Sequence, residues 1–489
     1  MRTTFHLKTL AVAVATLSVA SVTNAAGLDR SGQDVTAFLQ DGTYAEAVYT
    51  YIDADVSGKD SANNVPSNNT YVKGGNTGDI AEAYDFFRYG VKTDINDTFS
   101  VGVLYDEPFG AAVEYRDDSN FVSKGDVNAS ITQLTGGRFN AATIGNEITR
   151  LTGLATNANL TPEQRAAAAA GATSLSTAGA IARAEAGSAG ENTKVEVRSE
   201  NLTGLLGMKF GANKQFQVYG GPVAERIQAD VQLRGLAYGP ATGYTSTSNP
   251  ETDYGYIAGF SFSKPEIALK AALTYRSEID HDLTIAETYP LVGIRTAAGA
   301  IAQGAPAEQA AALGAAAANR TSKYEVTTPK SVNFDFQTGI NPTMLATAKV
   351  RWVPWSDFVL TPPLYNEVSK LNPLYAEDGL NIVDYDDDQW QVELGLSKRL
   401  APALGVSGTV GWDSGAGNPT SSLGPIEGYY SVGLGAKYNV TKEWAVSAGG
   451  KYLWFGDAKG RLPTDKIVGD FEDNNGYILG LKLSYQDIK

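Results

Sequence analysis

The sequence contains no cysteine and almost no histidine. Its 489 residues include two histidines, His6 and His281. The absence of cysteine excludes disulfides and thiolate metal ligands. Two histidines are too few for a zinc cluster. Ser-His-Asp catalysis would depend on His281, which we place in a loop after a predicted strand. We therefore predict no enzymatic activity, no cofactor and no bound metal.

Long hydrophobic runs are also scarce. The main one covers residues 10–22, follows Arg2 and Lys8, and is followed by small residues at 23–25. This order predicts a secretory signal peptide over residues 1–25. The run is too short for a spanning helix, and no later stretch is apolar for 18 residues. We therefore expect an exported protein without transmembrane helices.

Positive charge is in deficit. The formal net charge is −15, and without the signal peptide 37 basic residues face 54 acidic ones. This balance argues against nucleic acid, or any anionic surface, as the main partner. The acidic run at 386–388 is open to two interpretations, which are solvated loop charge and oxygen ligands for calcium.

Glycine and tyrosine are abundant, and hydrophobicity is spread by alternation. There are 52 glycines and 25 tyrosines. Over residues 476–485 one face carries Tyr477, Leu479, Leu481, Leu483 and Tyr485. Residues 390–396 and 429–438 repeat this pattern. Apolar faces with aromatic ends are typical of lipid-facing strands. A soluble β-sandwich also alternates, but aromatic residues at strand ends favour a membrane barrel.

Very short polar links alternate with long irregular segments along the chain. This sorting by length is typical of an outer-membrane barrel. The pattern predicts an all-β fold, a 14-stranded antiparallel transmembrane β-barrel over residues 43–489, with both chain ends periplasmic. The predicted strands are 43–56, 84–95, 98–115, 193–211, 216–233, 252–263, 266–277, 328–340, 343–353, 388–399, 404–412, 427–439, 443–454 and 476–486.

Two of the long segments, 128–190 and 284–320, are rich in alanine. Thr161, Pro162 and Glu163 form a favourable helix start, with a capping residue, a first-turn proline and an acid. We expect both segments to be extracellular loops that carry short helices. The alternative is a disordered insert of low complexity.

Alternation turns several charged side chains toward the predicted lumen. Basic groups inside a barrel are able to hold a carboxylate. The alternative is that they pair with acids such as Asp335 and Glu393 and simply fill the lumen. Lys451 and Arg198 are further inward candidates. The candidate ligand-binding residues are Arg88, Lys92, Asn333, Asp335, Lys349 and Arg351.

The third predicted strand is interrupted by Glu107, Pro108, Phe109 and Gly110. Proline donates no hydrogen bond to a sheet, and glycine permits a bulge. Such a break in a wall strand is a candidate lateral opening between lumen and bilayer. The alternative is an irregularity near the extracellular rim.

Several segments resemble the long-chain fatty acid transport porins of the Gram-negative outer membrane, a family that also includes toluene and other hydrocarbon channels. The most specific match is Thr-Pro-Lys-Ser-Val-Asn-Phe-Asp-Phe at 328–336, followed by Val-Arg-Trp at 350–352. Further matches lie at 26–28, 456–458 and 469–471. The resemblance covers nearly the whole chain after the signal peptide.

The resemblance implies a monomeric barrel with an N-terminal hatch in the lumen, here residues 26–42. It also implies a lateral exit at the kinked third strand and loops that collect the ligand. The sequence departs from the family pattern in two places. No Asn-Pro-Ala motif occurs in the hatch region, and four residues follow Tyr485.

Together these features predict passive uptake of long-chain fatty acids or other hydrophobic small molecules across the outer membrane. The expected surroundings are outer-membrane lipid and lipopolysaccharide. Two other functions stay open from the sequence. One is a structural barrel whose loops serve as an adhesin or phage receptor, and the other is a general polar porin.

Overall fold

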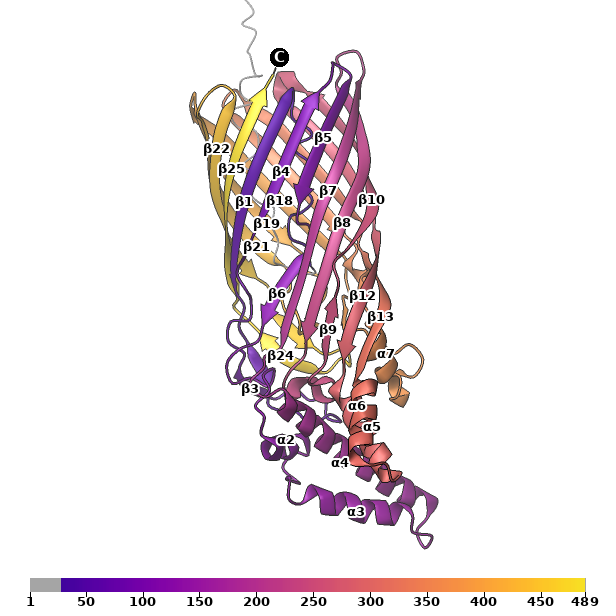
Figure 1. Cartoon of the computed structure of the whole chain (residues 1–489). Coiled ribbons are helices and arrows are strands. Elements are labelled where there is room, and N and C mark those ends of the chain that lie inside the picture. The colour runs from indigo at the N-terminus through magenta and orange to yellow at the C-terminus, as the bar shows by residue number, and fades with distance from the viewer. Residues whose placement is uncertain (1–27, 489) are drawn as a thin grey trace, which may run out of the picture.

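The computed structural model describes residues 28–488. It is a long barrel with helices gathered at one end and the C-terminus at the other (Figure 1). The predicted signal peptide, and residues 26 and 27 of the predicted hatch, lie outside the described residues. No helix of residues 28–488 is long and apolar enough to cross a membrane.

Fourteen antiparallel strands form the wall, and the barrel closes because β1 pairs with both β4 and β25. This confirms the predicted fold class. The continuous wall strands are β1 (Thr43–Asp55), β4 (Tyr84–Asp94), β7 (Lys194–Phe210), β8 (Phe216–Gln232), β15 (Met344–Val353), β18 (Gln389–Ala401), β19 (Leu404–Asp413), β21 (Tyr429–Asn439), β22 (Trp444–Phe455) and β25 (Asn475–Asp487).

The other wall strands consist of two segments each, in which a break separates two collinear pieces. These are β5 (Phe99–Asp106) with β6 (Gly110–Glu114), β9 (Thr245–Ser248) with β10 (Glu251–Lys264), β11 (Leu269–Arg276) with β12 (Ile279–Thr288), and β13 (Asn319–Thr328) with β14 (Ser331–Asn341).

Connections are sorted by length between the two ends of the barrel. The short links include residues 95–98, the helical turn η2 (Pro265–Ile267) and residues 402–403. They lie at the end that carries the C-terminus (Figure 1), which we call the turn end. The opposite end, which we call the loop end, carries every long connection. This is the two-sided arrangement predicted from the sequence.

The loop end carries the helices and the small strands. The helices are α2 (Val127–Leu134), α3 (Ile144–Ala155), α4 (Pro162–Gly187), α5 (Pro290–Ala302), α6 (Ala307–Ala318) and α7 (Pro363–Ser369), with the turns η1 (Leu236–Ala241), η3 (Trp355–Asp357) and η4 (Pro373–Tyr375). The small strands are β2 (Lys59–Ser61), β3 (Lys73–Asn76), β16 (Val359–Leu360), β17 (Val383–Asp384), β20 (Thr420–Ser421), β23 (Ala458–Arg461) and β24 (Ile467–Phe471).

Helix α4 begins at Pro162 as the capping pattern indicates. The Thr161 hydroxyl accepts from the Gln164 amide, and the Gln164 side chain accepts from the Thr161 amide. Its 26 residues make it longer than the short helices expected in this loop. The wall also reaches further than predicted, because β12 continues to Thr288 and β13 begins at Asn319. Helices α5 and α6 therefore make up most of the connection between β12 and β13.

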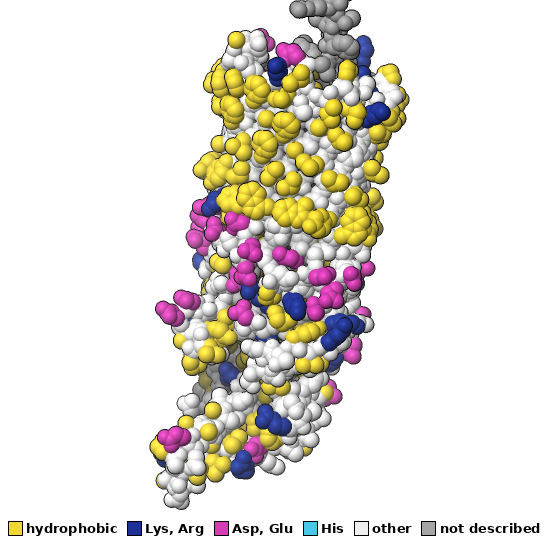
Figure 2. Space-filling model, turned by 180° about the vertical axis from the view of Figure 1, so that it is seen from behind, with side chains coloured by type: hydrophobic (Ala, Val, Ile, Leu, Met, Phe, Trp, Pro, Cys, Tyr) yellow, Lys and Arg dark blue, Asp and Glu magenta, His cyan; other side chains and the backbone are white. Residues whose placement is uncertain are grey.

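The outside of the barrel carries an apolar belt between the two ends. In β21, Tyr430, Val432 and Leu434 are exposed, whereas Ser431 and Lys437 are buried. Figure 2 shows the belt as a band of hydrophobic side chains with aromatic rings at its edge, beyond which acidic groups begin. Apolar-out and polar-in alternation is the reverse of a soluble protein, so this face suits a bilayer.

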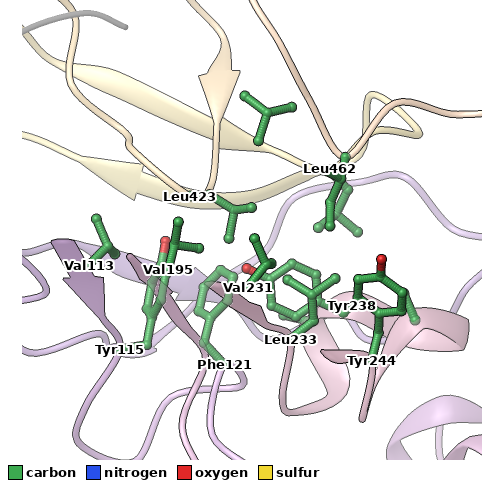
Figure 3. Close-up of a cluster of buried hydrophobic side chains, with 14 of the residues drawn as sticks. Val113, Tyr115, Phe121, Val195, Val231, Leu233, Tyr238, Tyr244, Leu423 and Leu462 are labelled. Atoms are coloured by element: carbon green, nitrogen blue, oxygen red, sulfur yellow. The ribbon is translucent and has the colours of Figure 1, made fainter. Parts of the chain in front are cut away.

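Loops from distant parts of the wall share a hydrophobic core at the loop end. Figure 3 shows Tyr115, Phe121 and Tyr238 facing Leu423 and Leu462 from the opposite segments. The rings of Tyr115 and Phe121 stack with centroids 3.9 Å apart. The Tyr115 hydroxyl donates to the Ser422 carbonyl. The loops are therefore packed against one another and form a compact cover.

A charge in the apolar belt should destabilise the folded barrel. We expect Leu434→Arg to lower the free energy of unfolding from lipid vesicles by about 2–4 kcal/mol, because the new charge meets hydrocarbon. Leu434 is 77% exposed and Leu374, in η4 at the loop end, is 81% exposed. Leu374→Arg is thus a matched control with little expected effect. Equal urea midpoints for the two variants would contradict a lipid-facing belt.

Candidate functional site

The described N-terminal residues 28–42, which we call the lumen segment, lie inside the barrel. Phe38 is fully buried, and its ring lies 5.8 Å from that of Tyr219 in β8. Glycines that face the lumen make room for the Phe38 ring. A Cβ atom on Gly102 would meet Phe38 at 2.7 Å, and one on Gly207 would meet it at 3.0 Å. The small residues of β5 and β7 therefore create room for this segment.

Arg351 in β15 binds the lumen segment through Asp29. Its Nε atom donates to Asp29 Oδ2 at 2.6 Å, and its Nη2 atom donates to Asp29 Oδ1 at 3.0 Å. Nη1 donates to the side chain of Asn333 at 2.9 Å. Both members of the ion pair are buried. A bidentate pair in a buried site is directional, so Arg351 fixes the position of Asp29.

A second carboxylate, Asp34, lies between two of the predicted cations. It is 3.0 Å from Lys349 Nζ and 3.4 Å from Arg88 Nη1. Burial alone would raise the pKa of Asp34, but Lys349 and Arg88 outweigh that effect and hold the pKa well below its usual range. Lys349 is also 3.8 Å from Asp335. Asp34 is therefore a shared counter-ion of Lys349 and Arg88, and Arg88 also lies 3.3 Å from Glu46.

Asn333 and Lys92 also contact the lumen segment. Asn333 Nδ2 donates to the Gly32 carbonyl at 2.8 Å. Lys92 Nζ donates to the Gln40 carbonyl at 2.6 Å and lies 2.7 Å from Asp94. Lys92 contacts the C-terminal end of the lumen segment and shares none of the described partners of Arg351. The structure thus gathers the predicted side chains around the protein's own chain, and ligand contact by them stays a prediction.

Two predictions about single side chains are wrong, one about the orientation of Arg198 and one about the position of His281. Arg198 faces outward, with its side chain 63% exposed, and pairs with Glu196. The reason is that the odd-numbered residues of β7 are the buried ones. His281 lies inside β12, not in a loop, and its Nε2 atom is 3.1 Å from Glu225. Lys451 does point inward, where it pairs with Glu393.

The predicted break in the third strand is present. β5 ends at Asp106 and β6 begins at Gly110, and the backbone between them pairs with the lumen segment. The Pro108 carbonyl accepts from the Arg30 amide at 2.7 Å, and the Gly110 amide donates to the Leu28 carbonyl at 2.7 Å. Part of the hydrogen bonding that a neighbouring wall strand would supply is therefore supplied from inside the barrel.

A cavity of about 570 Å³ lies in the wall beside this break. β4 pairs with β5 only over Tyr89–Asp94, so its earlier residues have no strand partner on that side. The gap ends where Ala81 bridges Val113. The cavity is lined from β4, β6, β7 and β8, and among its lining residues are Arg30, Tyr84, Glu107 and Ser199.

No group of three or more His, Asp or Glu side chains within residues 28–488 is arranged to hold a metal ion. In the acidic run at 386–388, Asp386 is 2.8 Å from Arg461. The Asp388 carboxylate accepts from the indole of Trp352 at 3.0 Å. Both side chains thus have partners within the protein.

Comparisons with known proteins identify the fold. No family model and no curated protein matches the sequence. A Pseudomonas aeruginosa FadL homologue is 14% identical, with a TM-score of 0.58, over 92% of this chain and 91% of that one. The P. putida toluene transporter TodX is 10% identical, with a TM-score of 0.49, over 96% and 94%. The Ralstonia pickettii toluene transporter TbuX is 9% identical, with a TM-score of 0.46, over 99% of each chain. This chain therefore has the fold of the FadL homologue.

Removing the Arg351 charge should loosen the lumen segment. Because the chain has no cysteine, Ser31→Cys provides a single reporter thiol at a position that is 2% exposed. We expect Arg351→Gln to raise its labelling rate by about tenfold or more, since Asp29 would be left buried without its partner. The measurement is thiol labelling of the folded barrel in vesicles.

Arg150→Gln is the matched control, because Arg150 is an exposed arginine of α3 paired with Glu147. It should leave the labelling rate unchanged. Identical labelling rates of Ser31→Cys with and without Arg351→Gln would show that the Asp29–Arg351 pair does not hold the lumen segment in place.

Proposed function

We propose that this protein is an outer-membrane transporter for passive uptake of hydrophobic molecules, with long-chain fatty acids as the first candidate cargo. The observation that carries the proposal is the break at Glu107–Gly110 with its wall cavity. The lumen of the same barrel holds the lumen segment. A barrel built in this way favours release through the wall over flow along the axis. The fold shared with the FadL homologue supports the same function.

The lumen segment argues against a general polar porin. An aqueous pore needs a continuous polar path along the barrel axis. Here the lumen segment crosses that path and is held by the Asp29–Arg351 pair and by the contacts of Asp34. A polar solute would have to break buried ion pairs to pass, at a cost of several kcal/mol.

The transported molecule follows a downhill route in this proposal. The loops at the loop end take it from the lipopolysaccharide layer, and each buried methylene contributes about 0.8 kcal/mol. It then reaches the lumen and leaves sideways between β4 and β6 into the bilayer. No energy source is needed, because the concentration gradient drives each step. The protein works as a monomer surrounded by outer-membrane lipid.

The lumen cations assist this route by exchanging a carboxylate of the protein for the carboxylate of the ligand. Asp29 and Asp34 occupy the positions that a fatty-acid carboxylate would take on Arg351, Lys349 and Arg88. Lys92, Asn333 and Asp335 complete the predicted lumen site. A ligand that replaces one of these carboxylates releases the lumen segment, because the same guanidinium cannot form both bidentate pairs at once.

Uptake in cells tests the function directly. A strain that lacks the gene should take up radiolabelled oleate several times more slowly than the same strain that expresses the protein, because lipopolysaccharide hinders partitioning of apolar solutes. Expression of the barrel without residues 128–190 separates transport from a receptor role. Equal oleate uptake with and without the full-length protein would contradict the proposal.

Straightening the third strand tests the lateral route. We expect Pro108→Val combined with Gly110→Val to reduce oleate uptake by about tenfold, because continuous β pairing would close the wall. Pro342→Val, in a short link at the turn end, is the matched control. Gel mobility before and after heating reports whether each barrel is folded. Normal uptake by a folded double variant, or stable ion conductance of the unaltered protein in planar bilayers, would refute lateral release.

A further inference from the structure

Arg30 extends from the lumen segment into the break of the wall. Its guanidinium carbon lies 4.0 Å from the centre of the Tyr84 ring, and the residue is 5% exposed. Gly110 makes this position possible, because a Cβ atom there would lie 2.3 Å from the same carbon. Arg30 and Tyr84 both line the wall cavity. A buried cation therefore forms part of the cavity's inner surface.

Arg30 forms no close ion pair within residues 28–488, although it feels the charge of Glu107. Its Nε atom has no hydrogen-bond partner there, and no carboxylate lies within 4.0 Å of its nitrogens. A buried cation without a close counter-ion is costly, so an anion that reaches it gains more than it would at the surface. The interaction with the Tyr84 ring compensates only in part.

Five acids line the cavity, namely Glu82, Asp85, Glu107, Glu196 and Glu200, and so do Arg198 and Arg226. Three of them pair with other arginines, namely Glu82 with Arg116, Glu196 with Arg198, and Glu200 with Arg226. Glu107 lines the same cavity, and its carboxylate lies 3.5 Å from the Phe87 amide. Because Glu107 interacts electrostatically with Arg30, its charge opposes an anionic guest there.

An apolar surface adjoins the gap on the outside. The rings of Phe87 and Tyr89 stack with centroids 5.9 Å apart, and Tyr89 lies 5.8 Å from Tyr105 of β5. Leu202, opposite Tyr105 in β7, is 53% exposed. A hydrocarbon chain that leaves the cavity can lie on this surface and continue into the bilayer.

We infer that Arg30 and the wall cavity form a binding site for the anionic headgroup of a single-chain amphiphile, a carboxylate whose tail lies against Phe87 and Tyr89. This inference rests on the proposed function and deepens it, because it names a charged amphiphile over a neutral hydrocarbon as the preferred cargo. Charge-assisted hydrogen bonds to a guanidinium supply the preference, and a neutral molecule cannot form them.

Binding of two chain-matched ligands tests the inference. The probes are radiolabelled laurate and dodecanol, measured by equilibrium dialysis on the full barrel in nanodiscs of phosphatidylcholine. We expect Arg30→Gln to weaken laurate binding by about tenfold and to leave dodecanol binding unchanged. Arg30→Lys should retain part of the affinity, and Glu107→Gln should strengthen laurate binding. The control is Arg320→Gln, an exposed arginine paired with Glu367.

The outcomes distinguish a headgroup site from an arginine that only supports the wall. An unchanged laurate-to-dodecanol ratio in folded Arg30→Gln would overturn the inference even if cells take up oleate normally. The Glu107→Gln variant keeps the test usable if Arg30→Gln fails to fold, since unchanged laurate binding there also counts against the site. Nanodiscs that contain lipopolysaccharide form a second arm. Loss of laurate binding in these nanodiscs would assign the site to a resident lipid phosphate and would overturn the inference that it binds a transported carboxylate.

Discussion

The buried pair between Asp29 and Arg351 is the interaction on which the rest of the site depends. Removing one partner of such a pair costs about 3–5 kcal/mol, because a charge is left in a low-dielectric interior. The pair therefore fixes where the lumen segment begins its path through the barrel. The two neighbours of Asp29 form the hydrogen bonds to the broken strand, in which the Leu28 carbonyl accepts and the Arg30 amide donates. The pair thus lies one residue away from the contacts between the lumen segment and the wall.

The proposed transport requires that the contacts of the lumen segment be exchangeable, because a permanently held segment would keep the lumen closed. The lumen cations are shared and not exclusively paired, since Lys349 and Arg88 both face Asp34. A carboxylate ligand offers these cations the same chemistry as Asp34 does. A ligand shifts such an equilibrium only by its difference in affinity between the two states. In the proposed exchange, replacement of one carboxylate by another leaves no cation unpaired.

The sequence predicted the wall well because period-two alternation repeats along each strand and reports its two environments. It failed where that contrast disappears. In β7, Glu196, Arg198 and Glu200 all face outward beyond the apolar belt, so polarity no longer marks the inner face. The partners of the lumen cations were missed for another reason. Asp29 and Asp34 lie in a segment without periodicity, and only charge complementarity with inward cations could have indicated them.

Backbone geometry connects the lumen site to the wall cavity. Residue Asp29 bridges Phe109 in antiparallel fashion, so the chain is extended there. Successive side chains of an extended chain point in opposite directions. Asp29 is therefore directed to Arg351 inside the barrel while Arg30 is directed to Tyr84 in the wall. In the proposed route, displacement of Asp29 bears on Arg30, because one peptide bond joins them. The geometry thus connects the proposed lumen site to the proposed lateral exit.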